Sequence, residues 1–110
     1  ILVTDNRIAA VGPRGKVGVV GARAQDDTQF EVRAFFPGNN GLSEDPVTGS
    51  LNASLAQWLI GEGLAPSAYR VAQGECRGRA GRVHILQEDG GQVWVGGRCL
   101  TAIEGRVHFP

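Results

Sequence analysis

A short polar segment, residues 44–50, carries the residue types in this chain that are best suited to chemistry. It reads Glu-Asp-Pro-Val-Thr-Gly-Ser and leads into an apolar run. Asp45 can cap free backbone amides and Pro46 suits the first helical position, so we expect a helix to begin here. The unpaired amides and the dipole at a helix N-terminus attract anions. The segment therefore predicts a binding site for a small acid.

The side chains of this segment fit that prediction. Thr48 and Ser50 can donate hydrogen bonds to a carboxylate, and Gly49 lets a ligand approach the backbone closely. Asp45 can hold a proton or anchor an amine. Adjacent carboxylates at a helix start usually point in different directions, so we do not expect Glu44 and Asp45 to form an acid–base pair. The alternative is a well-capped helix without a ligand.

The expected helix is apolar nearly all round. Residues 51–60 contain no charge, and apolar side chains recur at i, i+4 spacing in Val47, Leu51, Leu55 and Leu59. A helix without a polar face is typical of a buried helix. Glycines at positions 61 and 63 predict its end.

Strand patterns surround this helix on both sides. Alternation, valine-rich runs and turn signals predict strands at residues 1–4, 7–11, 16–23, 28–36, 69–73, 82–88, 92–95, 98–103 and 106–109, with a loop at 37–43. A sheet that curls around the helix would bury it completely. We therefore expect an α+β fold in which a strongly curved antiparallel or mixed, barrel-like sheet wraps around one central helix. The 17 glycines suit tight barrel corners.

Composition limits the class of protein. The 110 residues have a formal net charge of zero and are 42% hydrophobic, which predicts one domain over residues 1–110. The neutral charge disfavours nucleic-acid binding through counterion release, and no apolar run is long enough for a membrane helix. The chain contains no methionine and begins at Ile1, which indicates a fragment or a processed product.

The two cysteines give no sign of a disulfide framework or a metal site. Cys76 and Cys99 are far apart in the sequence, and no ligand spacing typical of zinc surrounds them. We expect both to be small buried residues on strands, with a cysteine-pair acid/base site as the less favoured alternative. Two scattered thiols also indicate a cytoplasmic protein.

Three segments together resemble a known family. Residues 35–59 read FFPGNNGLSEDPVTGSLNASLAQWL, Gln73-Gly74 is followed by RAGRV at 79–83, and residues 92–98 read QVWVGGR. These stretches are similar, in register and in order, to motifs of the phenazine-biosynthesis PhzF-like family. The resemblance covers residues 30–107 and is most specific at 44–50.

The resemblance implies a fold and a chemistry. PhzF-like proteins resemble diaminopimelate epimerase, with two pseudo-symmetric domains that each wrap a sheet around a central helix. They transfer protons without a cofactor or metal, on small carboxylates or amino-acid-like substrates. Carried over to this chain, the family motif makes Asp45 the catalytic aspartate. It makes substrate-binding residues of Thr48, Gly49, Ser50, Gln73 and Gly74.

The family's principal acid/base glutamate lies in the other domain and has no counterpart in these residues. The chain therefore resembles the C-terminal domain alone, and its expected partner is an N-terminal domain or a second copy. In such a homodimer the two turns at residues 45–50 would face each other. A non-catalytic module that binds carboxylates, or dimerises, is the alternative, and an inactive remnant is a third reading.

Overall fold

The computed structural model describes residues 15–110. In chain order its elements are β1 (Val17–Gln25), β2 (Thr28–Gly38), β3 (Gly41–Asp45), α2 (Gly49–Gly61), β4 (Ala68–Gln73), the 3-10 turn η2 (Glu75–Arg77), β5 (Gly81–Gln87) and β6 (Val93–Gly96). The strands predicted at residues 1–4 and 7–11 lie outside the described residues.

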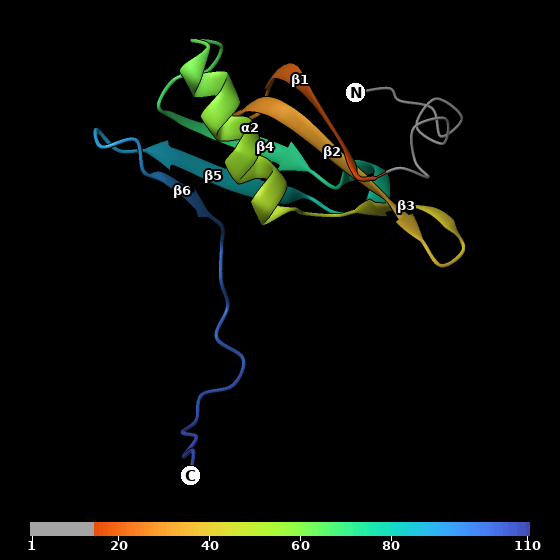
Figure 1. Cartoon of the computed structure of the whole chain (residues 1–110), viewed down its shortest axis with the longest axis vertical. Coiled ribbons are helices and arrows are strands. Elements are labelled where there is room, and N and C mark those ends of the chain that lie inside the picture. Colours follow the sequence, from red (N-terminus) through yellow and green to blue (C-terminus); the bar gives the residue numbers. More distant parts are fainter. Residues whose placement is uncertain (1–14) are drawn as a thin grey trace.

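The strands form one open mixed sheet with α2 on one face (Figure 1). The order is β1-β2-β4-β5-β6, with β3 also paired to β2. All pairings are antiparallel except that of β2 with β4. The predicted α+β class is confirmed. The predicted barrel-like wrapping is wrong, because the described sheet neither closes nor curls strongly around the helix.

A hairpin replaces the loop predicted at residues 37–43. Strand β2 continues through Pro37 to Gly38, and β3 returns from Gly41, with Pro37 opposite Leu42. Gly41 has a φ of +103°, a backbone conformation that glycine adopts without steric cost. The turn residues that predicted a loop therefore form only the tip of the β2–β3 hairpin.

The core lies between α2 and the sheet. It consists of buried residues from α2 and three strands, namely Val32, Ala56, Tyr69, Val71, Val83 and Ile85, and Leu51 and Leu55 pack against it. The rings of Phe30 and Tyr69 meet edge to face, with centroids 5.2 Å apart. In β2, Val32 faces this core, whereas Arg33 and Phe35 on the alternate positions are buried as well.

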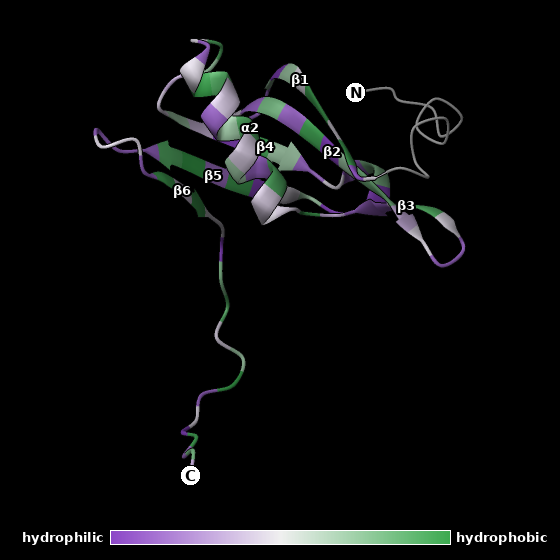
Figure 2. Cartoon of the chain, in the orientation of Figure 1, coloured by the Kyte–Doolittle hydropathy of each residue, from purple (hydrophilic) through white to green (hydrophobic). Residues whose placement is uncertain are grey.

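Helix α2 differs from the prediction of complete burial. Only Asn52, Ala56 and Leu59 are buried, and Trp58 is 52% exposed. An open sheet covers one side of a helix, so the opposite side meets solvent. Figure 2 shows the mixed hydropathy of α2.

The helix also begins later than predicted. Thr48 is its N-cap, so Asp45 is not the cap and Pro46 is not the first helical residue. The reason is that β3 holds the backbone extended as far as Asp45. The predicted end is confirmed: the helix stops at Gly61, and Gly63 turns left-handed with a φ of +71°.

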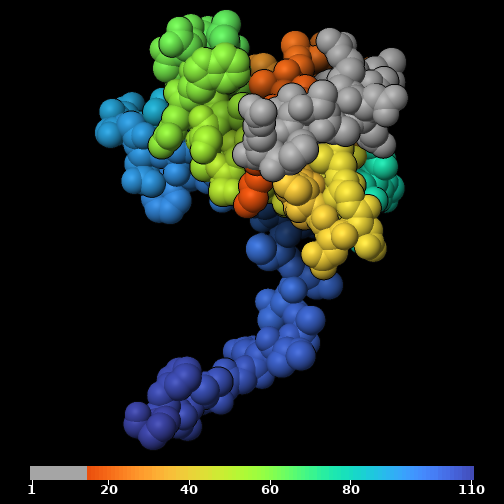
Figure 3. All heavy atoms as spheres, turned by 45° about the vertical axis from the view of Figure 1, so that its right-hand side comes forward, coloured from red at the N-terminus to blue at the C-terminus, as the bar shows by residue number. Residues whose placement is uncertain are grey.

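Two predictions in the C-terminal part are wrong. Residues 98–103 and 106–109 form no strand, and the chain beyond β6 extends away from the sheet (Figures 1 and 3). Cys76 and Cys99 are both exposed rather than buried on strands, because Cys76 lies in η2 and Cys99 in this extension. Among residues 15–110, no helix is long and apolar enough to cross a membrane.

Candidate functional site

Strand β3 separates the two neighbouring carboxylates. Asp45 is paired with Ala34 and Glu44 with Phe35. Paired residues share a face and successive residues alternate, so Asp45 lies on the α2 side and Glu44 on the other. There Glu44 accepts hydrogen bonds of 2.9 Å from Nε and Nη2 of Arg33. The prediction that these carboxylates do not form an acid–base pair agrees with this geometry.

Asp45 is oriented by the residue that begins the helix. The Thr48 hydroxyl donates to Asp45 Oδ2 at 2.8 Å and accepts from Gln73 Nε2 at 3.0 Å. Because this hydroxyl bonds to Asp45, it makes no hydrogen bond to the amides of its own helix. Thr48 therefore fixes the carboxylate and leaves the start of α2 uncapped by a side chain.

Gln73 is the fully buried centre of this network, with 0% of its surface exposed. Its Oε1 accepts from the Thr48 amide at 3.2 Å and from Asn52 Nδ2 at 2.9 Å. Its Nε2 donates to the Asp45 carbonyl at 3.3 Å as well as to Thr48. Both donors and both acceptor positions of the amide are used, so Gln73 ties β4 to the β3–α2 junction.

Gly74 and Gly81 let the backbones approach closely behind this network. A Cβ built on Gly74, whose φ is +96°, would lie 2.5 Å from the Pro46 carbonyl oxygen. A Cβ on Gly81 would lie 2.5 Å from the Gln73 carbonyl oxygen and 2.7 Å from Val47 Cγ2. Gly74 thus allows the backbone after β4 to lie against the Pro46 carbonyl, where a larger residue would collide with it.

The N-terminus of α2 offers backbone donors. The first amides of a helix have no partner within it, and the first turn of α2 contains no acidic residue. Gly49 and Ser50 are both exposed here, and a Cβ on Gly49 would meet no atom within 4 Å. The arrangement suits a small anion.

A pocket of about 490 Å³ opens beside this helix end. Its polar lining consists of Lys16, Asp45, Thr48, Ser50 and Ser54. Its apolar lining comes from β1, β2 and α2, through Val17, Gly18, Ala34, Phe35, Phe36 and Leu51. Of the residues that the structure describes, one cation, one carboxylate and three hydroxyls therefore face a space of small-molecule size with an apolar wall.

The structure brings the predicted site residues together in two layers. Asp45, Thr48 and Ser50 line the pocket, and Gly49 adjoins it at the helix start. Gln73 and Gly74 lie behind, where they support the junction. Whether each residue acts on a substrate stays a prediction.

Sequence reasoning missed two groups of residues. One is Asn52, whose signal was an amide in an otherwise apolar helix turn, four positions after Thr48. The other is Lys16 with Phe36, which strand pairing brings to the pocket and no motif marks. Among the described residues, no group of three or more His, Cys, Asp or Glu side chains could hold a metal ion.

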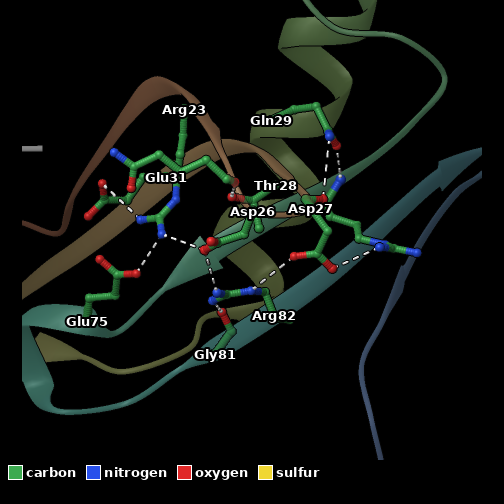
Figure 4. Close-up of polar contacts among 11 residues, drawn as sticks. Arg23, Asp26, Asp27, Thr28, Gln29, Glu31, Glu75, Gly81 and Arg82 are labelled. Atoms are coloured by element: carbon green, nitrogen blue, oxygen red, sulfur yellow. Dashed lines mark hydrogen bonds and ion pairs between the residues drawn. The ribbon is translucent and has the colours of Figure 1, made fainter.

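The sheet face opposite α2 carries a network of ion pairs (Figure 4). Arg23 Nη2 lies 2.8 Å from Glu75 Oε1 and 3.2 Å from Asp26 Oδ2. The hydrogen bond to Arg23 lowers the pKa of Glu75. Arg82 lies near Asp26 and Asp27. Charged side chains therefore gather on this face around the turn between β1 and β2.

The chain is similar in sequence to a protein family and to a curated protein. The family profile described as PhzC-PhzF, phenazine biosynthesis-like protein, matches residues 3–105. An uncharacterised isomerase of Pasteurella multocida (strain Pm70) is 32% identical over 85 residues, which are 77% of this chain and 29% of that protein. The chain thus spans less than a third of this relative's length. No solved structure matches the chain significantly.

Proposed function

Because the chain belongs to the PhzC-PhzF phenazine biosynthesis-like family, we propose that it forms half of the active site of an isomerase or epimerase. The reaction would be a cofactor-free proton transfer on a small carboxylate or amino-acid-like substrate. The observation that carries the proposal is the uncapped start of α2, which opens into a pocket beside an oriented aspartate.

The substrate carboxylate would bind at the N-terminus of α2. Amides of Gly49 and Ser50 would donate to its oxygens, and Lys16 would add positive charge. When a proton leaves the neighbouring carbon, negative charge moves into the carboxylate. Fixed donors at that position stabilise the charge without reorganising. The helix start would therefore serve binding and catalysis together.

Asp45 would contact the other end of the reacting centre. Its Oδ2 is held by Thr48, so the carboxylate has a defined direction towards the pocket. In this position it can anchor a substrate amine or take part in proton transfer. Phe36 and Leu51 would contact the apolar part of the substrate.

The main base would come from outside the described residues. Glu44 is bound to Arg33 on the opposite face and so cannot serve this pocket. We propose that an N-terminal domain of the family type, or a second copy, completes the site. A chain tested alone should then be a weak catalyst, since a base must be positioned and tuned to remove a carbon-bound proton. A cytoplasmic location is part of the same proposal.

A non-catalytic carboxylate-binding module is the second candidate, favoured because Asp45 is the one carboxylate among the described residues that line the pocket. Titration with small amino and hydroxy acids in D₂O separates the two. Binding with slow deuterium incorporation at the α-carbon supports the isomerase half-site. Binding without incorporation supports the binding module, and the absence of binding overturns both.

A substitution of Asp45 tests whether this residue acts in catalysis. Asp45→Asn should abolish deuterium incorporation and keep much of the binding. Gln57→Ala is the matched control, because Gln57 is exposed on α2 and does not line the pocket. Equal incorporation by Asp45→Asn and the wild-type chain would remove Asp45 from the catalytic machinery.

A further inference from the structure

The buried side-chain amide of Gln73 is held in one orientation by the backbone around it. Its Oε1 lies 3.2 Å from the backbone N–H of Thr48, which can only donate a hydrogen bond. Its Nε2 lies 3.3 Å from the backbone carbonyl of Asp45, which can only accept one. An amide turned by 180° would place donor against donor and acceptor against acceptor. The polarity of this side chain is therefore fixed.

Asn52 reinforces this orientation from the first turn of α2. Its Nδ2 donates to the Thr48 carbonyl oxygen at 2.8 Å, and a carbonyl oxygen can only accept. The same Nδ2 donates to Gln73 Oε1 at 2.9 Å. Asn52 and Gln73 are 1% and 0% exposed, so bulk solvent does not compete for these hydrogen bonds. The side-chain network thus takes its direction from backbone groups at each end.

The orientation of Gln73 determines where the Thr48 hydroxyl proton points. Gln73 Nε2 donates to Thr48 Oγ1 at 3.0 Å. A hydroxyl group has one proton to donate, and within the described residues Asp45 Oδ2, at 2.8 Å, is the acceptor that its hydrogen bonds reach. The proton therefore lies between Oγ1 and Oδ2. A proton on Oδ2 itself would leave the hydroxyl proton without an acceptor, so Oδ2 serves as an acceptor.

The two carboxylate oxygens of Asp45 are consequently not equivalent. Oδ2 is occupied by the Thr48 hydroxyl, whereas no hydrogen bond from any residue in the range 15–110 reaches Oδ1. Asp45 lines the pocket beside the start of α2. Oδ1 is thus the oxygen that this residue has left for a molecule bound in the pocket.

We propose, on the basis of the proposed function, that Gln73 and Thr48 are positioning residues that leave Oδ1 of Asp45 as its single acceptor for the substrate. Asp45 then presents a lone acceptor to the group next to the substrate carboxylate. A hydroxyl or an ammonium at this place donates to Oδ1 and strengthens binding. An acid without such a donor gains no hydrogen bond from Asp45.

The three hydroxyls of the pocket then have different roles. The Thr48 proton is used by Asp45, and the Ser54 hydroxyl donates to the Ser50 carbonyl oxygen at 3.2 Å. In the part of the chain that the structure describes, the Ser50 hydroxyl makes no hydrogen bond. Ser50 therefore remains as the hydroxyl that can donate to the substrate carboxylate, and Thr48 acts through Asp45.

Two matched acids test this assignment. Phenyllactate and 3-phenylpropionate share a carboxylate and a phenyl group, which suits the wall formed by Phe36 and Leu51. They differ in the 2-hydroxyl group, which can donate to Asp45 Oδ1. The wild-type chain should bind phenyllactate about tenfold more tightly, because a hydrogen bond to a charged acceptor is stronger than one between neutral groups. Calorimetric titration of both acids gives this preference as a ratio of dissociation constants.

Two substitutions of Thr48 separate its hydroxyl from its packing. Thr48→Val keeps the shape and the backbone hydrogen bonds to Gln73 and Asn52, but frees Oδ2, so that the Asp45 carboxylate can turn. The preference for phenyllactate should fall to about twofold. Thr48→Ser keeps the hydroxyl and loses the methyl group, and should retain about tenfold preference. A role in packing alone would give the opposite order, because serine packs less well than valine.

Gln73→Glu tests the preceding step. A carboxylate oxygen in place of Nε2 would accept the Thr48 proton, so Asp45 would lose it and the preference should fall as in Thr48→Val. Circular dichroism checks the fold, and where Gln73→Glu does not fold the two Thr48 variants decide. Ser50→Ala is the matched control. It should weaken both acids by the same factor, because its hydroxyl serves the carboxylate that they share.

The outcomes separate this proposal from the proposed function. If both acids bind and Thr48→Val keeps the wild-type preference, or Thr48→Ser loses it, the positioning role is wrong and the carboxylate site stands. A wild-type chain that binds 3-phenylpropionate as tightly as phenyllactate would also contradict the role of Oδ1. If neither acid binds, the carboxylate site itself is overturned, and the role of Oδ1 with it.

Discussion

Glu44 and Asp45 are adjacent in the sequence, yet their carboxylates lie on opposite faces of the sheet. Glu44 pairs with Arg33, and both side chains are about nine-tenths buried, at 11% and 10% exposed. Asp45 faces the pocket, where the Thr48 hydroxyl binds it. Glu44 therefore stabilises the fold, whereas Asp45 has the proposed role in catalysis.

This division predicts that two neighbouring substitutions change the stability by different amounts. Glu44→Ala should lower the free energy of unfolding by about 3 kcal/mol, because it removes a carboxylate that forms two hydrogen bonds with a largely buried guanidinium. Asp45→Asn should change it by less than about 1 kcal/mol, because the amide oxygen can still accept from Thr48. Urea unfolding measures both. A larger loss for Asp45→Asn than for Glu44→Ala would reverse the assignment.

Asp45→Asn and Glu44→Ala should also differ in their effects on proton exchange and ligand binding. Asp45→Asn should reduce proton exchange by at least about 10²-fold, the usual contribution of a positioned acid or base. Glu44→Ala should leave ligand binding intact at temperatures where it remains folded. Loss of binding in folded Glu44→Ala would show that the far face of β3 also shapes the pocket.

Gln73 should be among the least replaceable polar residues. Gln73→Leu keeps the approximate volume but leaves the Thr48 amide without its side-chain acceptor and removes one of the two acceptors of Asn52 Nδ2, the Thr48 carbonyl being the other. We expect a loss of about 2–4 kcal/mol in the free energy of unfolding, since each buried unsatisfied group costs about 1–3 kcal/mol. Gln57→Ala, on the exposed side of α2, should stay within about 0.5 kcal/mol. Similar losses in both variants would contradict the network.

Gly74 and Gly78 form a matched pair for testing the junction. Both have positive φ, +96° and +69°, but only a Cβ on Gly74 would collide with the Pro46 carbonyl oxygen. Gly78→Ala should cost about 1–2 kcal/mol through backbone conformation alone. Gly74→Ala should cost more and should also weaken ligand binding, because it displaces the backbone before α2. Equal costs with unchanged binding would remove Gly74 from the site's support.

The ion pairs of Figure 4 predict acid sensitivity. The hydrogen bond from Arg23 lowers the pKa of Glu75 below the ordinary value of about 4.5. A carboxyl group with a lowered folded pKa stabilises the protein above its unfolded pKa, and this contribution disappears as the pH falls through the folded pKa. The difference in melting temperature between the wild-type chain and Glu75→Gln should therefore be present at pH 7 and shrink below pH 4.5. A difference that grows on acidification would contradict this sign.

Local patterns predicted the parts of the fold that depend on local physics. Strands were correctly predicted at residues 28–36 and 82–88, and glycines marked the end of α2, but alternation gave only part of the buried face of β2, because Arg33 and Phe35 are buried as well as Val32 and Ala34. The start of α2 was misplaced because Asp45 and Pro46 are good helix-starting residues in isolation. Pairing of β3 with β2 overrides that preference, and such pairing is not visible in a local window.

The open sheet could not be predicted from the apolar helix. Trp58 reads as a core residue by type, but the sheet covers only one side of α2, and Trp58 lies 52% exposed on the other. In the candidate site, too, a local motif identifies only the residues that lie close together in the sequence. The motif at residues 44–50 identified Asp45, Thr48 and Ser50, whereas the role of Gln73 depends on a parallel pairing between β2 and β4 that brings distant segments together.

The central claim is that the start of α2 binds a small carboxylate, and amide chemical shifts test it most directly. The measurement is a titration of ¹⁵N-labelled chain with an α-amino or α-hydroxy acid, with the methyl ester of the same acid as the control. We predict saturable shifts at Gly49, Ser50 and Leu51 with the acid and none with the ester. Equal shifts with both compounds, or saturable shifts elsewhere in the chain and none at these three amides, would contradict the account.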